Sequence, residues 1–281
     1  LFRSATFVPA PPLRPIKTDQ TFLGYKRPGG RGVGTRNDIV ILGVNSRVAS
    51  FVKRLEVMLK PLAQSAVNID SIVAVAHTEG SYTNGNNQEL LLRTLAGFMI
   101  HPNIGAVLCV DAGGQGVTNQ MLRQAALELN YPLDAVPHAF LSLDQAFGES
   151  LAAGVRIVQG WVDTVGQFKR TPQPLSELKI ALQCGGSDAF SGISGNPLAA
   201  WVAKQVIQAG GSAVLAETDE LNGAEAYALD KVASQATAER FLMMLERFEA
   251  QVNALGKSGK GNPSGGNLFR GLYNIYLKSL G

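Results

Sequence analysis

Apolar residues in the first half of the chain form short continuous runs, separated by segments with apolar side chains at helical spacing. Residues 38–44, 69–76 and 106–110 are typical of strands buried on both faces. The helices predicted between and after these strands are residues 48–62, 89–99 and 117–129. Strands this apolar that alternate with helices predict a parallel sheet covered on both faces.

The same alternation returns after a polar, proline-containing break at residues 166–176, which predicts a linker. The elements predicted beyond it are strands at 178–183 and 212–216 and helices at 197–209 and 237–255. Residues 1–21 contain four prolines and little periodicity, so they predict an extended arm or linker. The expected fold class is α/β, with two Rossmann-like units at residues 22–165 and 176–281, each with a mostly parallel sheet.

Composition narrows the functional class. The 281 residues are 46% hydrophobic and carry a net charge of +3 from dispersed basic residues, which argues against nucleic-acid binding. No apolar run approaches the roughly 18–20 residues that a membrane span needs. The two cysteines, Cys109 and Cys184, form no Cys-x-x-Cys pair, so a reduced cytoplasmic location is expected. The chain does not begin with Met and shows no evident signal peptide, which favours a fragment of a longer protein.

Polar loops follow the predicted strands, at residues 77–87, 111–116, 184–196 and 217–225. Ligands of parallel α/β sheets bind beyond the carboxyl ends of the strands. We therefore expect His77, Asp188 and Glu217 to face a shared cleft. No Gly-Lys-Ser/Thr follows the glycine-rich segment at residues 184–196, and no Gly-x-Gly-x-x-Gly follows a strand there, so no nucleotide cofactor is expected.

Three of these segments carry candidate chemistry, and each has a plainer interpretation. The glycine-rich segment from Cys184 to Pro197 could present backbone N–H groups to an anion, or could be a flexible turn. The carboxylates between Glu217 and Glu225 could bind a divalent cation or supply an acid and a base, or could be a solvated helix start. His77 suits general-base work, although a lone histidine is more often structural.

Several motifs occur together and in order from about residue 22 to the end of the chain. They are Gly24-Tyr-Lys-Arg27, Gly30-Arg-Gly-Val-Gly-Thr-Arg-Asn37, His101-Pro-Asn103, Cys184 to Pro197, Gly210 to Glu225, Gly261-Asn-Pro-Ser264 and Lys278-Ser-Leu-Gly281. Collectively they resemble the altronate/galactarate dehydratase family, which also includes the large subunit of sulfolactate sulfo-lyase. The chain stops inside the last motif, so the resemblance suggests a truncated member.

The chain departs from the family pattern at three positions where members usually carry cysteine. Here these positions are Ser46, Ser81 and Gly114. Neither serine nor glycine can replace a thiolate on iron or zinc. Any metal site is therefore expected to be rich in oxygen and to hold Mg, Mn, Ca or Fe. The metal ligands that the resemblance implies are Asp188, Glu217 and Glu220.

The resemblance implies a hydro-lyase that dehydrates a sugar acid by β-elimination. A base removes the proton α to the carboxylate, and an acid protonates the departing β-hydroxyl. His77 and Lys278 are the implied acid/base residues. The implied substrate contacts are Arg36, Asn37, Ser187 and Asn196.

Two alternatives remain open at the level of the sequence. One is a sulfo-lyase that eliminates sulfite from a sulfonated hydroxy acid. The other, suggested by the missing cysteines, is a catalytically silent binding or assembly subunit. The expected partners are a small anionic sugar acid, a small N-terminal-type domain or subunit, and further copies of the chain in a homo-oligomer. The 281 residues alone are expected to be inactive as a lyase.

Overall fold

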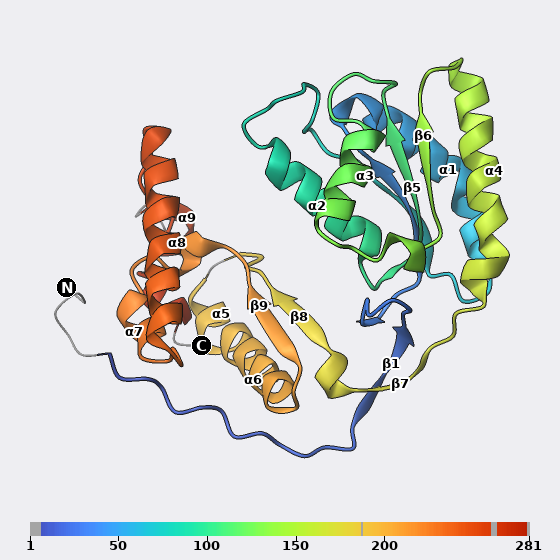
Figure 1. Ribbon diagram of the computed structural model, residues 1–281. Helices are drawn as coiled ribbons and strands as arrows, with labels where there is room; N and C mark the ends of the chain where they lie inside the picture. The colour runs from blue at the N-terminus through green and yellow to red at the C-terminus, as the bar shows by residue number, and fades with distance from the viewer. Residues whose placement is uncertain (1–6, 187, 260–262, 280–281) are drawn as a thin grey trace. The chain divides into compact units, whose positions relative to one another are not determined.

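The computed structural model describes residues 7–186, 188–259 and 263–279, and the chain divides into two compact units. One unit is Thr21–Gln173, and the other is Pro174–Gly281 together with the N-terminal segment up to Gln20. Each is α/β, as the sequence predicts (Figure 1). Within the described residues, no helix is long and apolar enough to cross a membrane.

The Thr21–Gln173 unit is built on a four-stranded parallel sheet with the order β4-β3-β5-β6. Its strands are β3 (Asp38–Gly43), β4 (Ser71–Val75), β5 (Ile104–Asp111) and β6 (His138–Ser142). The first three confirm the strands that the apolar runs predict. The half-buried β6 at the sheet edge, and the helix that follows it, lie outside the predicted pattern.

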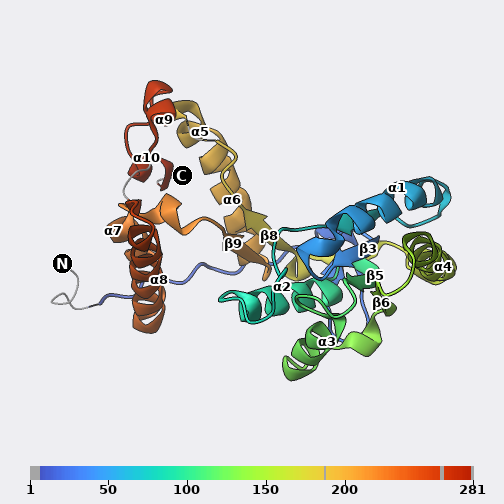
Figure 2. The same ribbon diagram turned by 90° about the horizontal axis from the view of Figure 1, so that it is seen from above.

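Helices cover both faces of this sheet (Figure 2). They are α1 (Ala49–Ser65), α2 (Gln88–Ile100), α3 (Asn119–Glu128) and α4 (Phe147–Gly166). Alternate residues of β3 point to opposite faces, so Ile39 and Ile41 pack with α1 and α4, whereas Val40 and Leu42 pack with α2 and α3. All six residues of β3 are buried, which is why its sequence reads as a continuous apolar run.

The other unit has a smaller sheet, in which β8 (Lys179–Leu182) and β9 (Ser212–Leu215) pair in parallel. The pairing bears out the predicted strands, but this sheet has two strands and helices make up most of the unit. The helices are α5 (Ala189–Ile193), α6 (Gly195–Gln208), α7 (Glu225–Leu229), α8 (Gln235–Ala254), α9 (Gly265–Phe269) and α10 (Ile275–Ser279).

The proline-rich N-terminal segment is extended over residues 7–20 (Figure 1). It belongs to the same unit as α6, to which it is bonded at two places. Ile16 N–H donates to the Gln208 carbonyl over 2.9 Å, and the Gln208 side-chain amide donates to the Arg14 carbonyl over 2.9 Å. The segment therefore has fixed hydrogen-bond partners and is more than a loose linker.

Two buried arginines close the amino end of the four-stranded sheet. Both arginines, Arg27 and Arg31, lie in the turn between β1 (Thr21–Lys26) and β2 (Val33–Gly34). These two strands form a small sheet with β7 (Thr171–Pro174). Arg31 donates to the carbonyls of His101 and Ile104 over 2.8 and 2.7 Å. Arg27 donates to the Pro102 carbonyl over 2.7 Å and lies between the rings of Tyr25 and Phe168. Burial lowers the pKa of each arginine to about 10, which leaves both charged at neutral pH.

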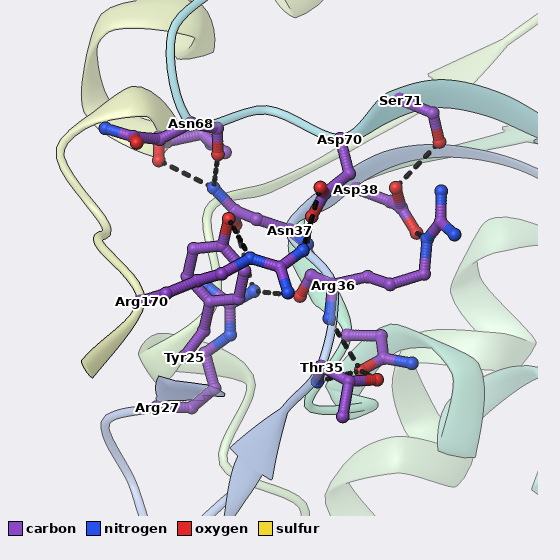
Figure 3. A network of polar contacts seen from close by, with 12 residues as sticks. Tyr25, Arg27, Thr35, Arg36, Asn37, Asp38, Asn68, Asp70, Ser71 and Arg170 are labelled. Carbon is purple, nitrogen blue, oxygen red and sulfur yellow. Dashed lines mark hydrogen bonds and ion pairs between the residues drawn. The ribbon is translucent and has the colours of Figure 1, made fainter. Parts of the chain in front are cut away.

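Asn37 lies at the centre of this network (Figure 3). Its Oδ1 accepts a 2.9 Å bond from Arg27, and its amide donates to the carbonyls of Asn68 and Val165 over 2.6 and 3.0 Å. Its backbone N–H donates to Asp70 over 2.7 Å. The side chain is fully buried, and every polar atom of its amide has a protein partner. Asn37 therefore joins the turn after β1 and the start of β3 to the end of α4.

We expect Asn37→Ala to lower the free energy of unfolding by about 3 kcal/mol, because Arg27 and two buried carbonyls would lose their partner. Arg36→Ala is the matched control. Its side chain is 56% exposed and bonds Asp38 over 3.2 Å, and such a surface pair contributes at most about 1 kcal/mol. Urea denaturation measures both values. Equal losses for the two variants would contradict a central role for Asn37.

Candidate functional site

The strand order reverses direction at β3 and β5 of the four-stranded sheet. The chain leaves β3 for β4 on one side and then crosses to β5 on the other side of β3. The loops after β3 and β5 therefore run in opposite directions, which is the arrangement that opens a ligand crevice in doubly wound sheets. The structure gathers three loops there: residues 44–48, 76–87 and 112–118.

The first two loops meet at Ser46 and Ser81. Their hydroxyl groups are hydrogen-bonded to each other, and Ser46 N–H donates to the Glu79 carbonyl over 2.8 Å. These are two of the three positions at which the resemblance described above implies cysteine. The structure therefore brings together two positions that lie in different loops of the sequence.

The third loop is fastened to the same place. The buried amide of Asn45 donates to the carbonyls of Gln115 and Val117 over 3.1 and 2.8 Å, and Val117 N–H donates to the Gly80 carbonyl over 2.9 Å. Gly116 has a φ of 73°, and a Cβ there would collide with the Gly80 carbonyl oxygen. Close backbone approach thus requires glycine at this position.

Arg47 spans the three loops from the short helix η2 (Ser46–Val48). Its Nε donates to the Ser81 carbonyl over 3.1 Å, and its Nη1 donates to Gln115 Oε1 over 3.2 Å. The guanidinium carbon lies 5.9 Å from the centre of the Tyr82 ring. Two anchoring bonds hold this exposed cation in one orientation at the edge of the sheet.

His77 is held in the same cluster of loops by both ring nitrogens. Nε2 lies 2.8 Å from the Gly43 carbonyl, and Nδ1 accepts a 3.2 Å bond from Glu79 N–H. With Nδ1 accepting, the proton of the neutral ring is on Nε2. His77 must give up one of these backbone bonds before it can exchange a proton with a substrate, and its acid/base role stays a prediction.

A cavity of about 220 Å³ lies beside these residues. Its polar lining includes Glu79, Ser81 and Asn87, and its apolar lining is Leu91 and Val117. The Glu79 carboxylate accepts a 2.6 Å bond from the Asn87 amide. The cavity lies between the 76–87 loop and the first turns of α2.

The Pro174–Gly281 unit holds a second cluster after β8 and β9. The thiol of Cys184 and the carboxylates of Glu217 and Glu220 offer ligand atoms that all lie within 4.8 Å of one another. The Glu217 carboxylate also accepts a 2.9 Å bond from Cys184 N–H. Glu217 has a φ of 69°, a strained conformation for a residue other than glycine. By contrast, burial in β5 raises the pKa of the Cys109 thiol, so that cysteine is an inert core residue.

The structure gives the remaining predicted residues different settings. Asp188 caps α5 by accepting a 2.7 Å bond from Ser191 N–H, and it is not part of the 4.8 Å cluster. Asn196 is half-buried in the first turn of α6. Ser187 lies outside the described residues, and Lys278 is in α10, but its side chain is not among those described.

Arg36 and Asn37, predicted as substrate contacts, lie at the amino end of β3, at the opposite edge of the sheet from the loop cluster. Protein groups occupy the whole Asn37 amide, so substrate binding would require breaking the network in Figure 3. His77 belongs to one unit, whereas Asp188 and Glu217 belong to the other. Their shared cleft stays a prediction.

Sequence reasoning missed two residues. Arg47 immediately follows Ser46, and a cation directly after a buried strand at the switch point is a signal that was available. Cys184 was visible at the start of the glycine-rich segment, but nothing in the sequence places its thiol beside Glu217. That proximity depends on the parallel pairing of Leu182 with Leu215.

A doubly wound sheet with polar loops gathered beside its switch point defines a small-molecule-binding α/β protein. Comparison with known families identifies it further. Residues 24–166 match the model for the second domain of D-galactarate dehydratase/altronate hydrolase, and residues 175–281 match the model for the C-terminal part of D-galactarate/altronate dehydratase. The chain belongs to the galactarate/altronate dehydratase family.

Individual relatives agree with this assignment. The chain is 32% identical to altronate dehydratase of Escherichia coli K12, over 92% of this chain and 51% of the relative. It is 30% identical to altronate dehydratase of Bacillus subtilis 168, over 94% of this chain and 52% of the relative. It is 29% identical to (2R)-sulfolactate sulfo-lyase subunit beta of Chromohalobacter salexigens, over 93% of this chain and 64% of the relative. The chain spans about half the length of the altronate dehydratases that it matches.

Substitutions of Gly114 and Gly116, both in the 112–118 loop, test how closely the three loops must approach one another. Gly116→Ala and Gly114→Ala both place alanine at a positive φ, of 73° and 90°, but a Cβ at Gly114 meets no described atom within 4 Å. We expect Gly114→Ala to lower the free energy of unfolding by about 1 kcal/mol, and Gly116→Ala to lower it by about 2 kcal/mol more. Thermal unfolding measures the difference. A Gly116→Ala variant as stable as Gly114→Ala would show that the loops are not closely fastened.

Proposed function

We propose that this chain provides two domains of a hydro-lyase that removes water from a sugar acid. The observation that carries the proposal is the match of consecutive segments, 24–166 and 175–281, to two domain models of the same dehydratase family. The polar loops at the carboxyl edge of each sheet support it, because they offer hydroxyl, amide and charged groups for a hydroxylated anion.

The reaction is a β-elimination. A base takes the proton from the carbon α to the carboxylate, the electron pair forms a carbon–carbon double bond, and the β-hydroxyl leaves as water after protonation. The resulting enol becomes a 2-keto-3-deoxy acid. Negative charge develops on the substrate carboxylate when the α-proton is removed, so a fixed cation next to that carboxylate lowers the barrier. His77 and Lys278 remain the proposed acid/base residues.

A divalent metal fits the second cluster. Cys184, Glu217 and Glu220 would hold it, because their ligand atoms already lie within 4.8 Å of one another. When bound, the ion would supply positive charge to stabilise an anionic substrate oxygen. The two carboxylates suit Mn²⁺, and a thiolate among the ligands favours Fe²⁺ over Mg²⁺ and Ca²⁺. Asp188 is a less suitable ligand than predicted, since its carboxylate caps α5.

Two other functions have specific support. The relative in Chromohalobacter salexigens is a sulfo-lyase subunit, and the chain spans 64% of it, more than of the altronate dehydratases. Its name as a subunit also supports a partner domain or subunit for this chain. The hydroxyl pair of Ser46 and Ser81 supports a silent binding or assembly role, because the pair offers no thiolate. The homo-oligomer and the cytoplasmic location stay predictions.

The function is tested by product analysis. The natural polypeptide that contains this chain, supplied with Mn²⁺ or Fe²⁺, is incubated with D-altronate, D-galactarate and (2R)-sulfolactate. We expect a 2-keto-3-deoxy acid from at least one sugar acid, detected by mass spectrometry, and no turnover by the 281 residues alone. Sulfite release without any dehydration would favour the sulfo-lyase. Absence of both products would favour the binding or assembly role.

The metal cluster is tested by Mn²⁺ binding, followed by electron paramagnetic resonance. We expect Cys184→Ser and Glu217→Gln each to weaken Mn²⁺ binding at least about tenfold, because each removes an anionic ligand. Glu246→Gln, at an exposed position on α8, is the control and should leave the affinity unchanged. Equal Mn²⁺ affinity in all four proteins would refute the cluster as a metal site.

A further inference from the structure

Arg47 is a fixed cation that has no carboxylate partner within the described part of the chain. The ion pairs found there join Arg36 to Asp38 and Arg170 to Asp70. Arg47 instead donates through Nε and Nη1 to a carbonyl and an amide oxygen, both neutral acceptors. Its Nη2 takes part in neither bond. The guanidinium is therefore anchored through two of its three nitrogens, and Nη2 keeps its donors for a ligand.

Glu79 places a negative charge in the neighbouring loop without pairing to Arg47. Its Oε1 accepts a 3.2 Å bond from the Thr78 hydroxyl, and its Oε2 accepts a 2.6 Å bond from the Asn87 amide. These bonds fix the carboxylate in the lining of the 220 Å³ cavity. Arg47 lies beside the cavity and does not line it: it bonds the Ser81 carbonyl and lies near the Tyr82 ring, and both of these residues belong to the lining.

The cavity suits a short, hydroxylated chain. Its volume of about 220 Å³ lies below the roughly 300–1,000 Å³ of pockets for drug-sized ligands and corresponds to about seven waters at ~30 Å³ each. The Glu79 carboxylate and the side chains of Ser81 and Asn87 can exchange hydrogen bonds with hydroxyl groups, and Leu91 and Val117 provide an apolar wall.

We propose that Arg47 binds the carboxylate of a sugar acid whose hydroxylated chain lies in this cavity, and that Glu79 selects for acids with a single carboxylate. The inference rests on the proposed function and deepens it by naming the substrate contacts. A carboxylate accepts charge-assisted hydrogen bonds from a guanidinium, here from Nη2 of Arg47, and anchoring of that guanidinium before binding reduces the entropy lost on binding. A second carboxylate at the far end of the ligand would meet Glu79 and be repelled.

Glu79 would therefore determine whether the site prefers an aldonate or an aldarate. An aldonate has an uncharged hydroxyl at the end opposite its carboxylate, and that hydroxyl can donate to Glu79. An aldarate has a carboxylate there, which cannot. The preferred ligand is therefore a sugar acid with a single carboxylate.

The experiment uses the 281-residue chain and three probes: D-altronate, D-galactarate and the uncharged polyol altritol. Affinities come from isothermal titration calorimetry, and the binding position comes from the amide NMR signals of Gly80, Ser81 and Gln115. We expect altronate to bind more tightly than either galactarate or altritol. Altronate should also shift the amide signals of these three residues.

Three variants separate the roles of the two charges. Arg47→Met should weaken altronate binding about tenfold to a hundredfold, the range for loss of a charge-assisted bond, and leave altritol unchanged. Glu79→Gln should improve galactarate binding severalfold relative to altronate, because it removes the repulsion. Arg54→Met, at an exposed position on α1, is the matched control and should bind all probes as the unaltered chain does.

Unchanged altronate affinity in Arg47→Met, or no altronate binding to the unaltered chain, would overturn the site. So would altronate-induced shifts confined to residues of the Pro174–Gly281 unit, which would still leave the lyase proposal standing. An unaltered ratio of galactarate to altronate affinity in Glu79→Gln would overturn the selection by Glu79. If Arg47-dependent binding occurs but the natural polypeptide forms no keto acid, the site stands and the proposed function fails.

Discussion

The hydrogen bond between the buried Arg27 guanidinium and Asn37 Oδ1 is the interaction on which the Thr21–Gln173 unit depends most. Both side chains are withdrawn from water, so each requires the other. Together with Arg31 they bind backbone carbonyls that precede and begin β5, and they join the small β1-β2-β7 sheet to the parallel sheet. The motif from Gly24 to Asn37 therefore has an architectural role through Arg27, Arg31 and Asn37.

The fixed amino end of the four-stranded sheet has a consequence for the loops at its carboxyl edge. With the strand register set, the loops after β3, β4 and β5 end at one place, and Asn45, Gly80 and Gly116 fasten them together through backbone contacts. Arg47 then bridges all three loops. Side chains fixed in this way need little reorganisation to meet a ligand, which is the condition for electrostatic stabilisation of an anionic transition state.

The two units offer complementary chemistry. The loops of the Thr21–Gln173 unit present an anchored cation and hydroxyl groups, whereas the Pro174–Gly281 unit presents a thiol and two carboxylates close enough to share one ion. The β-elimination that we propose needs a cation for the carboxylate and a polar partner for the departing hydroxyl. The hydroxyl pair at Ser46 and Ser81 gives the first unit a neutral surface where the family pattern has thiols.

The sequence alone determined β3, β4 and β5 of the four-stranded sheet, because a strand buried on two faces must be apolar throughout, as Ile39 to Leu42 are. Its motifs also determined the family. Only the tertiary structure decided what individual polar residues do. Asn37 and Asp188 look like site residues in the sequence, but one bonds buried carbonyls and the other caps a helix. Arg47 and Cys184 gained significance only through neighbours distant in the chain, Ser81 and Glu217. Such roles depend on which loops the strand order brings together, and local sequence patterns do not contain that order.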